Sequence, residues 1–199
     1  MAFVHLHNHS EYSMLDGATR VSDMVARAVK LGMPAVALTD HGFMYGIPEL
    51  GLACDAYNLK SPERKVWKSD KAALEAGADP ASLDAPDPEE DPRGAAQHAR
   101  DLEAWEATGS LDAVKPYVIK PIFGCEVYFT PDDTLARDRK PDLYHMILIA
   151  TNETGYVNLM QTVSEAAVEG FYYRPRVTLD NLRRHSEGLI ATSACLSGI

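Results

Sequence analysis

Three histidines alternate with other residues near the start of the chain, at positions 5, 7 and 9. Successive side chains of a strand point to opposite faces, so these three imidazoles would share one face. Imidazole nitrogen is a common ligand for zinc, manganese and iron. We therefore predict a short strand over residues 3–6, with metal ligands at His7 and His9 where it ends. His5 lies deeper in the predicted strand and is assigned a structural or supporting role; surface solubility is the alternative for all three.

Two further polar groups accompany apolar runs of the sequence. Asp40 and His41 directly follow the run 35–38, and active groups of α/β folds gather where strands end. Glu126 lies within the apolar run 122–129, where an unpaired carboxylate would be costly to bury. A carboxylate that bridges two cations would resolve that cost, and a salt bridge is the alternative. For Asp40 and His41, the alternative is a turn with a bystander histidine.

Three other residues carry little signal by themselves. His145 opens the apolar run 146–150, Asp16 is typical of a turn, and Cys195 is typical of a buried structural thiol. The sequence has no Walker loop, dinucleotide-binding glycine fingerprint or serine nucleophile elbow. Any chemistry is therefore predicted to be metal-assisted, with closely spaced cations acting on a phosphate ester.

Apolar periodicity predicts alternating strands and helices. The predicted helices cover 22–32, with Ser22 as N-cap, then 48–58 and 153–168. The predicted strands cover 3–6, 34–39, 122–129, 144–150 and 188–192. This alternation predicts an α/β fold with a parallel sheet, open or closed as a barrel. With about five core strands, we expect the chain to stop before a barrel closes.

Composition changes over residues 61–112, which hold 13 acidic and 6 basic residues and five prolines. We predict a solvated surface insertion there, with short helices near 69–77 and 95–107 and an irregular stretch at 84–92. A role in binding a partner is the alternative. The insertion carries −7 of the net charge of −10. The acidic total is therefore weak grounds against a phosphate-containing substrate, since bound cations would offset carboxylates elsewhere.

The remaining composition is that of a cytoplasmic globular protein. Cys54, Cys125 and Cys195 are an odd, widely spaced set, which does not predict a disulfide framework. No apolar run is long enough to span a bilayer, and the first residues do not form a secretory signal. We expect a cytoplasmic location without membrane contact.

Five segments together resemble the polymerase and histidinol phosphatase (PHP) domains at the N-terminus of bacterial DNA polymerase III alpha subunits. These segments are residues 3–17, 38–42, 120–126, 170–176 and 188–195. The resemblance implies a distorted β/α barrel of about seven strands, incomplete in this chain, without the polymerase palm, fingers and thumb. It implies two to three divalent cations, zinc and/or manganese, with magnesium as an alternative. The implied metal ligands are His7, His9, Asp16, His41, Glu126, His145 and Cys195, with Asp40 and His5 as neighbouring or catalytic groups.

The resemblance implies a metal-dependent 3′–5′ exonuclease that proofreads, within a polymerase whose partners are DNA and other replicative subunits. Arg174 and Arg176 are predicted to contact DNA phosphate, with a solvated face as the alternative. The family's last two ligands, an Asp-x-His pair, would lie beyond residue 199. Two other functions stay open: a phosphomonoesterase such as histidinol phosphatase, and a non-catalytic docking module of the polymerase.

Overall fold

The computed structural model describes residues 3–138 and 140–198. The chain forms two compact units, and the boundaries fall inside a helix and just before a strand. The first unit combines the segments before Cys54 and after Ile119, and the second is Cys54–Ile119. All residues singled out as candidate ligands belong to the first unit, so the site depends on the fold of that unit alone.

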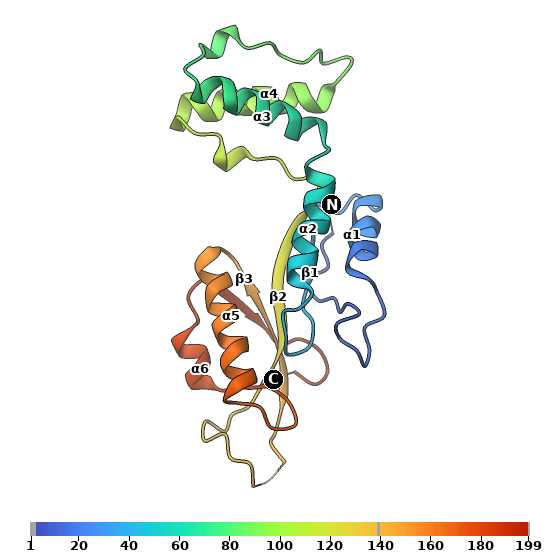
Figure 1. Ribbon diagram of the computed structural model, residues 1–199, viewed down its shortest axis with the longest axis vertical. Helices are drawn as coiled ribbons and strands as arrows, with labels where there is room; N and C mark the ends of the chain where they lie inside the picture. The colour runs from blue at the N-terminus through green and yellow to red at the C-terminus, as the bar shows by residue number, and fades with distance from the viewer. Residues whose placement is uncertain (1–2, 139, 199) are drawn as a thin grey trace. The chain divides into compact units, whose positions relative to one another are not determined.

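A five-stranded mixed sheet organises the first unit (Figure 1). Its strands are β1 (Ala35–Leu38), β2 (Lys120–Phe129), β3 (Tyr144–Ala150), β4 (Arg176–Val177) and β5 (Leu189–Thr192). The order is β1-β2-β3-β5, and β4 pairs with β2. β1 and β4 run parallel to β2, whereas β3 and β5 join antiparallel. The prediction of a parallel sheet is confirmed for β1, β2, β4 and β5, which run in one direction. It was wrong for β3, because the described residues between β2 and β3 contain no crossover helix.

The predicted number of strands, about five, agrees with the sheet, but one of the predicted strands is not part of it. Residues 3–6 form no strand, although the N–H of Ala37 donates to the carbonyl of His5 at 3.2 Å. The N–H of Thr39 likewise donates to the carbonyl of Asn8 at 2.9 Å. The N-terminal segment therefore follows β1 through separate hydrogen bonds. The fifth strand is instead the short β4, which the sequence analysis missed.

Four helices accompany this sheet: α1 (Val21–Lys30), α2 (Ile47–Asn58), α5 (Glu153–Val168) and α6 (Leu179–Arg184). Three of them match predicted helices within two residues, and α6 was not predicted. The cap assigned to Ser22 was wrong, because Ser22 lies inside the first turn of α1 and Arg20 precedes the helix without a side-chain cap. By contrast, Asn152 caps α5 through a hydrogen bond from the N–H of Gly155.

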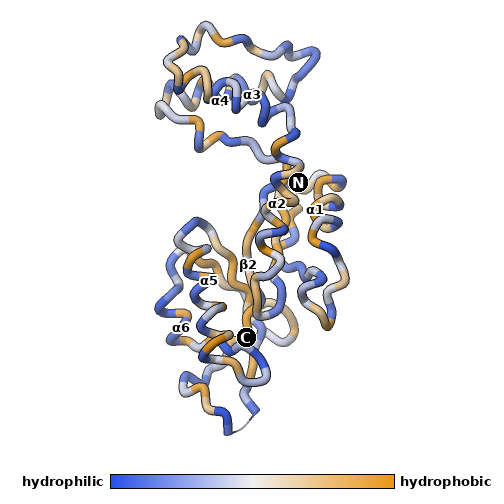
Figure 2. The backbone as a smooth tube through the Cα atoms, in the orientation of Figure 1, coloured by the Kyte–Doolittle hydropathy of each residue, from blue (hydrophilic) through white to orange (hydrophobic). Residues whose placement is uncertain are grey.

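One hydrophobic core cluster of the first unit lies between α5 and the sheet. Its buried members from the sheet are Cys125, Val127, Leu148 and Val177, and α5 contributes Leu159, Val163 and Ala166. Figure 2 shows β2 mostly in the hydrophobic colours, as expected for a strand hydrogen-bonded on both edges. This buried strand carries Glu126 into the unit and fixes its position.

The second unit is a pair of packed helices with a small core of its own. α3 (Pro62–Glu75) and α4 (Pro92–Thr108) are longer than predicted, and each begins with proline after a capping Ser61 or Asp91. Short 3₁₀ helices cover Pro80–Ser82 and Asp112–Val114. Trp67, Leu74 and Leu111 form the buried core. The expected irregular stretch is confirmed over residues 84–91, but the unit is more than a solvated excursion.

Polar side chains are also buried between α3 and α4. Gln97 donates to Asp101 at 2.6 Å, and His98 contacts Asp70 at 2.8 Å. All four residues are buried. Burial raises the pKa of Asp101 to about 6, and the nearby carboxylate of Asp70 adds to that rise against the opposing hydrogen bond from Gln97. This network is a titratable element of the second unit.

Among the described residues, no helix is long and apolar enough to cross a membrane.

Candidate metal centre

Six of the predicted ligands converge at the end of β1 and the middle of β2. Their ligand atoms form three groups: His7 with His9 and Glu126, His9 with Asp16 and His41, and His41 with Glu126 and His145. Within each group the ligand atoms lie within 4.8 Å of one another. Each pair of groups shares one residue, so the three groups close into a ring. Such a ring suits neighbouring cations joined by shared ligands.

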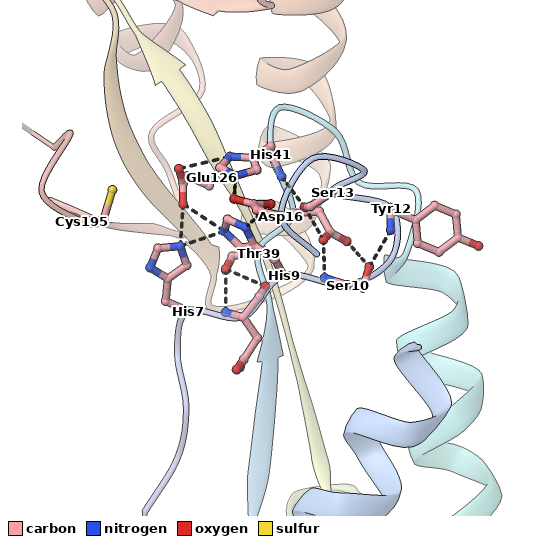
Figure 3. A network of polar contacts seen from close by, with 12 residues as sticks. His7, His9, Ser10, Tyr12, Ser13, Asp16, Thr39, His41, Glu126 and Cys195 are labelled. Atoms are coloured by element: carbon pink, nitrogen blue, oxygen red, sulfur yellow. Dashed lines mark hydrogen bonds and ion pairs between the residues drawn. The ribbon is translucent and has the colours of Figure 1, made fainter. Parts of the chain in front are cut away.

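Glu126 is the centre of this arrangement (Figure 3), and its side chain is 1% exposed. Its Oε2 lies 2.5 Å from Nε2 of His7 and 3.1 Å from Nε2 of His9. Its Oε1 faces the Nδ1 atoms of His41 and His145. The main chain places it there, because the N–H of Glu126 donates to the carbonyl of Asp40 and its carbonyl accepts from Gly42.

Two buried polar atoms in this ring have no hydrogen-bond partner among the described residues, as expected at a metal site. Oε1 of Glu126 and Nδ1 of His41 are 3.2 Å apart, yet neither makes a hydrogen bond within the described part of the chain. A buried polar atom without a partner is costly. A cation coordinated by both atoms would remove that cost, and imidazole with carboxylate is a donor set that zinc and manganese accept.

Asp16 completes the group on the open side of the ring. Its Oδ1 lies 3.3 Å from Nδ1 of His9, and its Oδ2 lies 2.9 Å from Nε2 of His41. The hydrogen bond with His41 lowers the pKa of Asp16; burial opposes this effect, and the hydrogen bond with His9 adds to it. The Asp16 side chain is 54% exposed, so it is the most accessible of the six residues that form the ring.

Gly17 explains why Asp16 can reach the ring. A Cβ atom at this position would lie 1.8 Å from the carbonyl oxygen of Ser10. The N–H of Gly17 also donates to the carbonyl of Ser13 at 2.7 Å. The loop 10–17 is thus folded tightly on itself, and only glycine permits the close approach that positions Asp16.

Asp40 does not face the ligand ring. It is buried, and its Oδ1 accepts hydrogen bonds of 2.7 Å from the N–H of Ser10 and from Oγ of Ser13, while its Oδ2 accepts one from Oγ of Ser10. Asp40 therefore acts as a neighbouring group that anchors the loop carrying His9 and Asp16. The sequence analysis missed both serines, because no local pattern distinguishes them from solvent-exposed turn residues.

The electrostatics of the ring are those of carboxylates surrounded by imidazoles. Burial acts to raise the pKa of Glu126, but the facing imidazoles of His41 and His9 outweigh it and hold that pKa well below its usual range. The carboxylate of Glu126 in turn raises the pKa of His9 and of His41, although burial opposes both. Burial lowers the pKa of His145, which favours the neutral imidazole that coordinates metal.

Cys195 lies at the edge of the ring. Its Sγ atom is 3.4 Å from Nδ1 of His145, and the residue is exposed. It belongs to none of the three groups, and Figure 3 shows it apart from the dashed network. His5, predicted to lie deeper than His7, is instead exposed and packs edge-on against Phe3 at 4.7 Å between ring centroids. Both roles therefore stay predictions: Cys195 contacts the ring only through His145, and His5 has no side-chain contact with a ring member among the interactions of the described residues.

The two arginines have different environments. Arg174 is exposed, and its guanidinium lies 5.5 Å from the ring centroid of Tyr128. Arg176 is 2% exposed and donates to the carbonyls of Gly170, Ala136 and Leu135 at 2.8–2.9 Å. The prediction that Arg176 contacts DNA phosphate is corrected, because its donors already hold the adjoining loops together.

A family model for the PHP domain matches residues 5–199 of the chain. The chain belongs to the PHP domain family. It is also similar to DNA polymerase III alpha subunits of Borreliella burgdorferi, at 35% identity, and of Treponema pallidum and Helicobacter pylori, each at 34%. These matches cover 99–100% of this PHP domain but only 11–12% of those relatives.

The PHP domain also has a weak structural likeness to a Bifidobacterium adolescentis protein described with a proposed metal-dependent phosphoesterase activity. The TM-score is 0.34 at 15% identity, over 82% of this chain and 32% of the other. At this level the likeness adds nothing to the family assignment, which rests on the family model and the sequence relatives.

Proposed function

We propose that this PHP domain binds two to three divalent cations and hydrolyses the terminal phosphodiester of a DNA 3′ end. It would do so as the proofreading exonuclease of a replicative DNA polymerase alpha subunit, with DNA and the other polymerase subunits as partners in the cytoplasm. Zinc and/or manganese are the proposed metals, with magnesium as the alternative. The closed ring of three ligand groups is the observation that carries this proposal.

The residues present determine what each part of the site would do. His7, His9, His41, His145 and the two carboxylates of Asp16 and Glu126 would hold the cations, with Cys195 as a further ligand at the edge. Bound cations would activate water and stabilise negative charge on a phosphate ester. Glu126 would be shared between cations, because its two oxygens face different histidines. Asp40 would keep the loop of His9 and Asp16 in place.

The test is release of single nucleotides from a 5′-labelled primer with a mismatched 3′ end, using the chain and the longer polymerase in manganese or zinc. We expect 3′ shortening that EDTA abolishes and that Glu126→Gln reduces by at least about 100-fold. Glu187→Gln, at an exposed glutamate outside the ring, is the matched control. Hydrolysis of histidinol phosphate without attack on DNA would favour the phosphomonoesterase. No hydrolysis of either substrate by the metal-loaded protein would favour the docking module.

A further inference from the structure

A cleft of about 780 Å³ opens beside the metal centre, and His41 lines both. Three segments of the first unit form its walls: residues 11–15, residues 43–45 and residues 171–175, together with Tyr128. Exposed apolar side chains gather along it, including Met14 at 89% and Leu15 at 84% exposure. An exposed apolar surface of this kind usually marks a binding site.

Aromatic rings dominate the cleft. Phe43 and Tyr45 stack on each other, with 5.1 Å between centroids and 9° between planes. Tyr45 is 66% exposed, and Phe171 and Tyr173, on the wall formed by residues 171–175, are 49% and 69% exposed. These rings present faces and edges that the described residues leave open to solvent, and such surfaces can accept the flat face of another ring.

The cleft connects to the metal centre through a row of stacked groups. The rings of His41 and Tyr128 are nearly parallel, 14° apart with 5.9 Å between centroids. The guanidinium of Arg174 lies beside the same tyrosine, at 5.5 Å from its centroid. Among the described residues lining the cleft, Arg174 is the one arginine or lysine. One arginine that can bind phosphate beside several aromatic side chains is typical of a site for single-stranded nucleic acid. At such a site the bases stack on aromatic rings, and a few positive charges hold the sugar-phosphate backbone.

We propose that this cleft receives the terminal bases of a single-stranded nucleic acid whose last phosphodiester lies at the metal ring. This inference rests on the proposed phosphodiester hydrolysis and adds how the strand is held. Every base has a π-face, so stacking on Tyr45 and Phe171 would accept any sequence. Arg174 would contact a backbone phosphate next to the ring of metal-ligand candidates. A paired terminus would have to unstack its last bases to enter, which costs least at a mismatch.

The experiment measures binding without catalysis. A 5′-fluorescein-labelled oligothymidylate and an abasic oligonucleotide of equal length are titrated with the chain in EDTA, and fluorescence anisotropy is recorded. We expect tighter binding of the oligothymidylate. Tyr45→Ala and Phe171→Ala should each weaken that binding by roughly 5- to 100-fold and leave abasic binding unchanged. Tyr45→Phe, which keeps the ring, should bind as the wild type does.

Arg174→Met should weaken both oligonucleotides and reduce the slope of log affinity against log salt by about one. Tyr117→Ala and Arg183→Met are matched controls, because both side chains are exposed and neither lines the cleft. Equal affinity for the abasic strand, or wild-type binding by both alanine variants, would overturn the proposal. A third result would also overturn the proposal: Tyr45→Ala destabilises the longer polymerase but leaves DNA binding unchanged. The cleft would then be occupied by another part of the polypeptide and not by DNA.

A parallel assay separates this inference from the proposed hydrolysis. Bis(p-nitrophenyl) phosphate has the phosphodiester but no nucleobases, so the manganese-loaded wild type should hydrolyse it if the metal ring is catalytic. Hydrolysis of this compound together with equal binding of the two oligonucleotides would overturn the cleft proposal alone. Base-dependent binding without any hydrolysis would support the cleft and overturn the proposed nuclease.

Discussion

Ser13 donates from Oγ to Oδ1 of Asp40 at 2.7 Å, and the same Oγ accepts from the N–H of His41 at 3.2 Å. One buried hydroxyl thus joins the loop of Asp16 to the end of β1. The two ligand-bearing motifs are far apart in the sequence, and this contact sets their distance. The position of the ligand ring therefore depends on residues that do not belong to it.

Replacing Asp40 should destabilise the first unit. Asp40→Asn keeps one acceptor but replaces the oxygen that accepts from Oγ of Ser10 and removes the charge. Hydrogen bonds to charged groups contribute about 1.5–3 kcal/mol, so we expect a loss of that order in the free energy of unfolding. Urea denaturation measures it, with Asp55→Asn at an exposed position of α2 as control. A change below about 0.5 kcal/mol, typical of surface substitutions, would contradict the anchoring role.

Replacing Gly17 should weaken metal binding without removing a ligand. Gly17→Ala places Cβ against the carbonyl of Ser10, so the loop must move and carry Asp16 with it. Displacing a group that orients a ligand typically costs 10- to 100-fold in affinity, and competition with a chelator measures this. Gly51→Ala in α2, whose nearest neighbour would be 3.8 Å away, is the matched control. Equal affinity in both variants would show that the loop does not position Asp16.

Replacing Arg176 should lower the stability of the protein, whereas replacing Arg174 should not. Arg176→Met removes the guanidinium donors to the carbonyls of Gly170, Ala136 and Leu135, and we expect a loss on the order of 3 kcal/mol in unfolding free energy. Arg174→Met removes an exposed side chain and should change it by less than about 1 kcal/mol. Urea denaturation of both variants checks the contrast. Similar effects would contradict the structural role assigned to Arg176.

Asp101 should make the second unit less stable as the pH rises. Its pKa is about 6 in the folded protein against an ordinary value of 3.8, so the folded state binds more protons between these values. The free energy of unfolding therefore falls as pH increases through this window. Asp101→Asn should remove that contribution and stabilise the protein at pH 7 by about 1–3 kcal/mol.

Urea denaturation at acidic and neutral pH measures the effect of Asp101→Asn. The variant should differ most from the wild type above the folded pKa, where the buried carboxylate is charged. Asp84→Asn, at an exposed position between α3 and α4, is the control and should change stability by less than about 0.5 kcal/mol. Equal stabilities of Asp101→Asn and the wild type at pH 7 would contradict the buried charge.

Much of the metal ring was predictable from local sequence pattern. His7, His9, His41 and Glu126 stand next to or within apolar runs, so period and burial select them from the sequence. His41 and Glu126 lie at a strand end and inside a strand as predicted, whereas His7 and His9 follow a segment that is hydrogen-bonded beside β1 and forms no strand. Asp16 and His145 could be selected only through family resemblance, because a turn aspartate and a strand-end histidine are ordinary by themselves. Their proximity to the ring comes from tertiary contacts such as that of Asp16 with His41.

The errors have physical reasons. The direction of β3 depends on the loop 130–143, and strand periodicity is the same for parallel and antiparallel pairing. Residues 3–6 alternate like a strand, yet their hydrogen bonds to β1 are too few for a ladder. Arg176 carries a charge that predicts exposure, but nearby carbonyls satisfy its donors in the interior. None of these outcomes is encoded in a short window of sequence.

Metal content tests the central claim most directly. The chain and the longer polymerase proposed to contain it are equilibrated with zinc or manganese, freed of excess metal and subjected to elemental analysis, with circular dichroism as a check on folding. We predict about two to three equivalents per chain, most of which Glu126→Gln loses and His5→Gln keeps. Absence of stoichiometric metal from both wild-type proteins, or full retention by Glu126→Gln, would contradict the metal centre and leave a structural PHP domain.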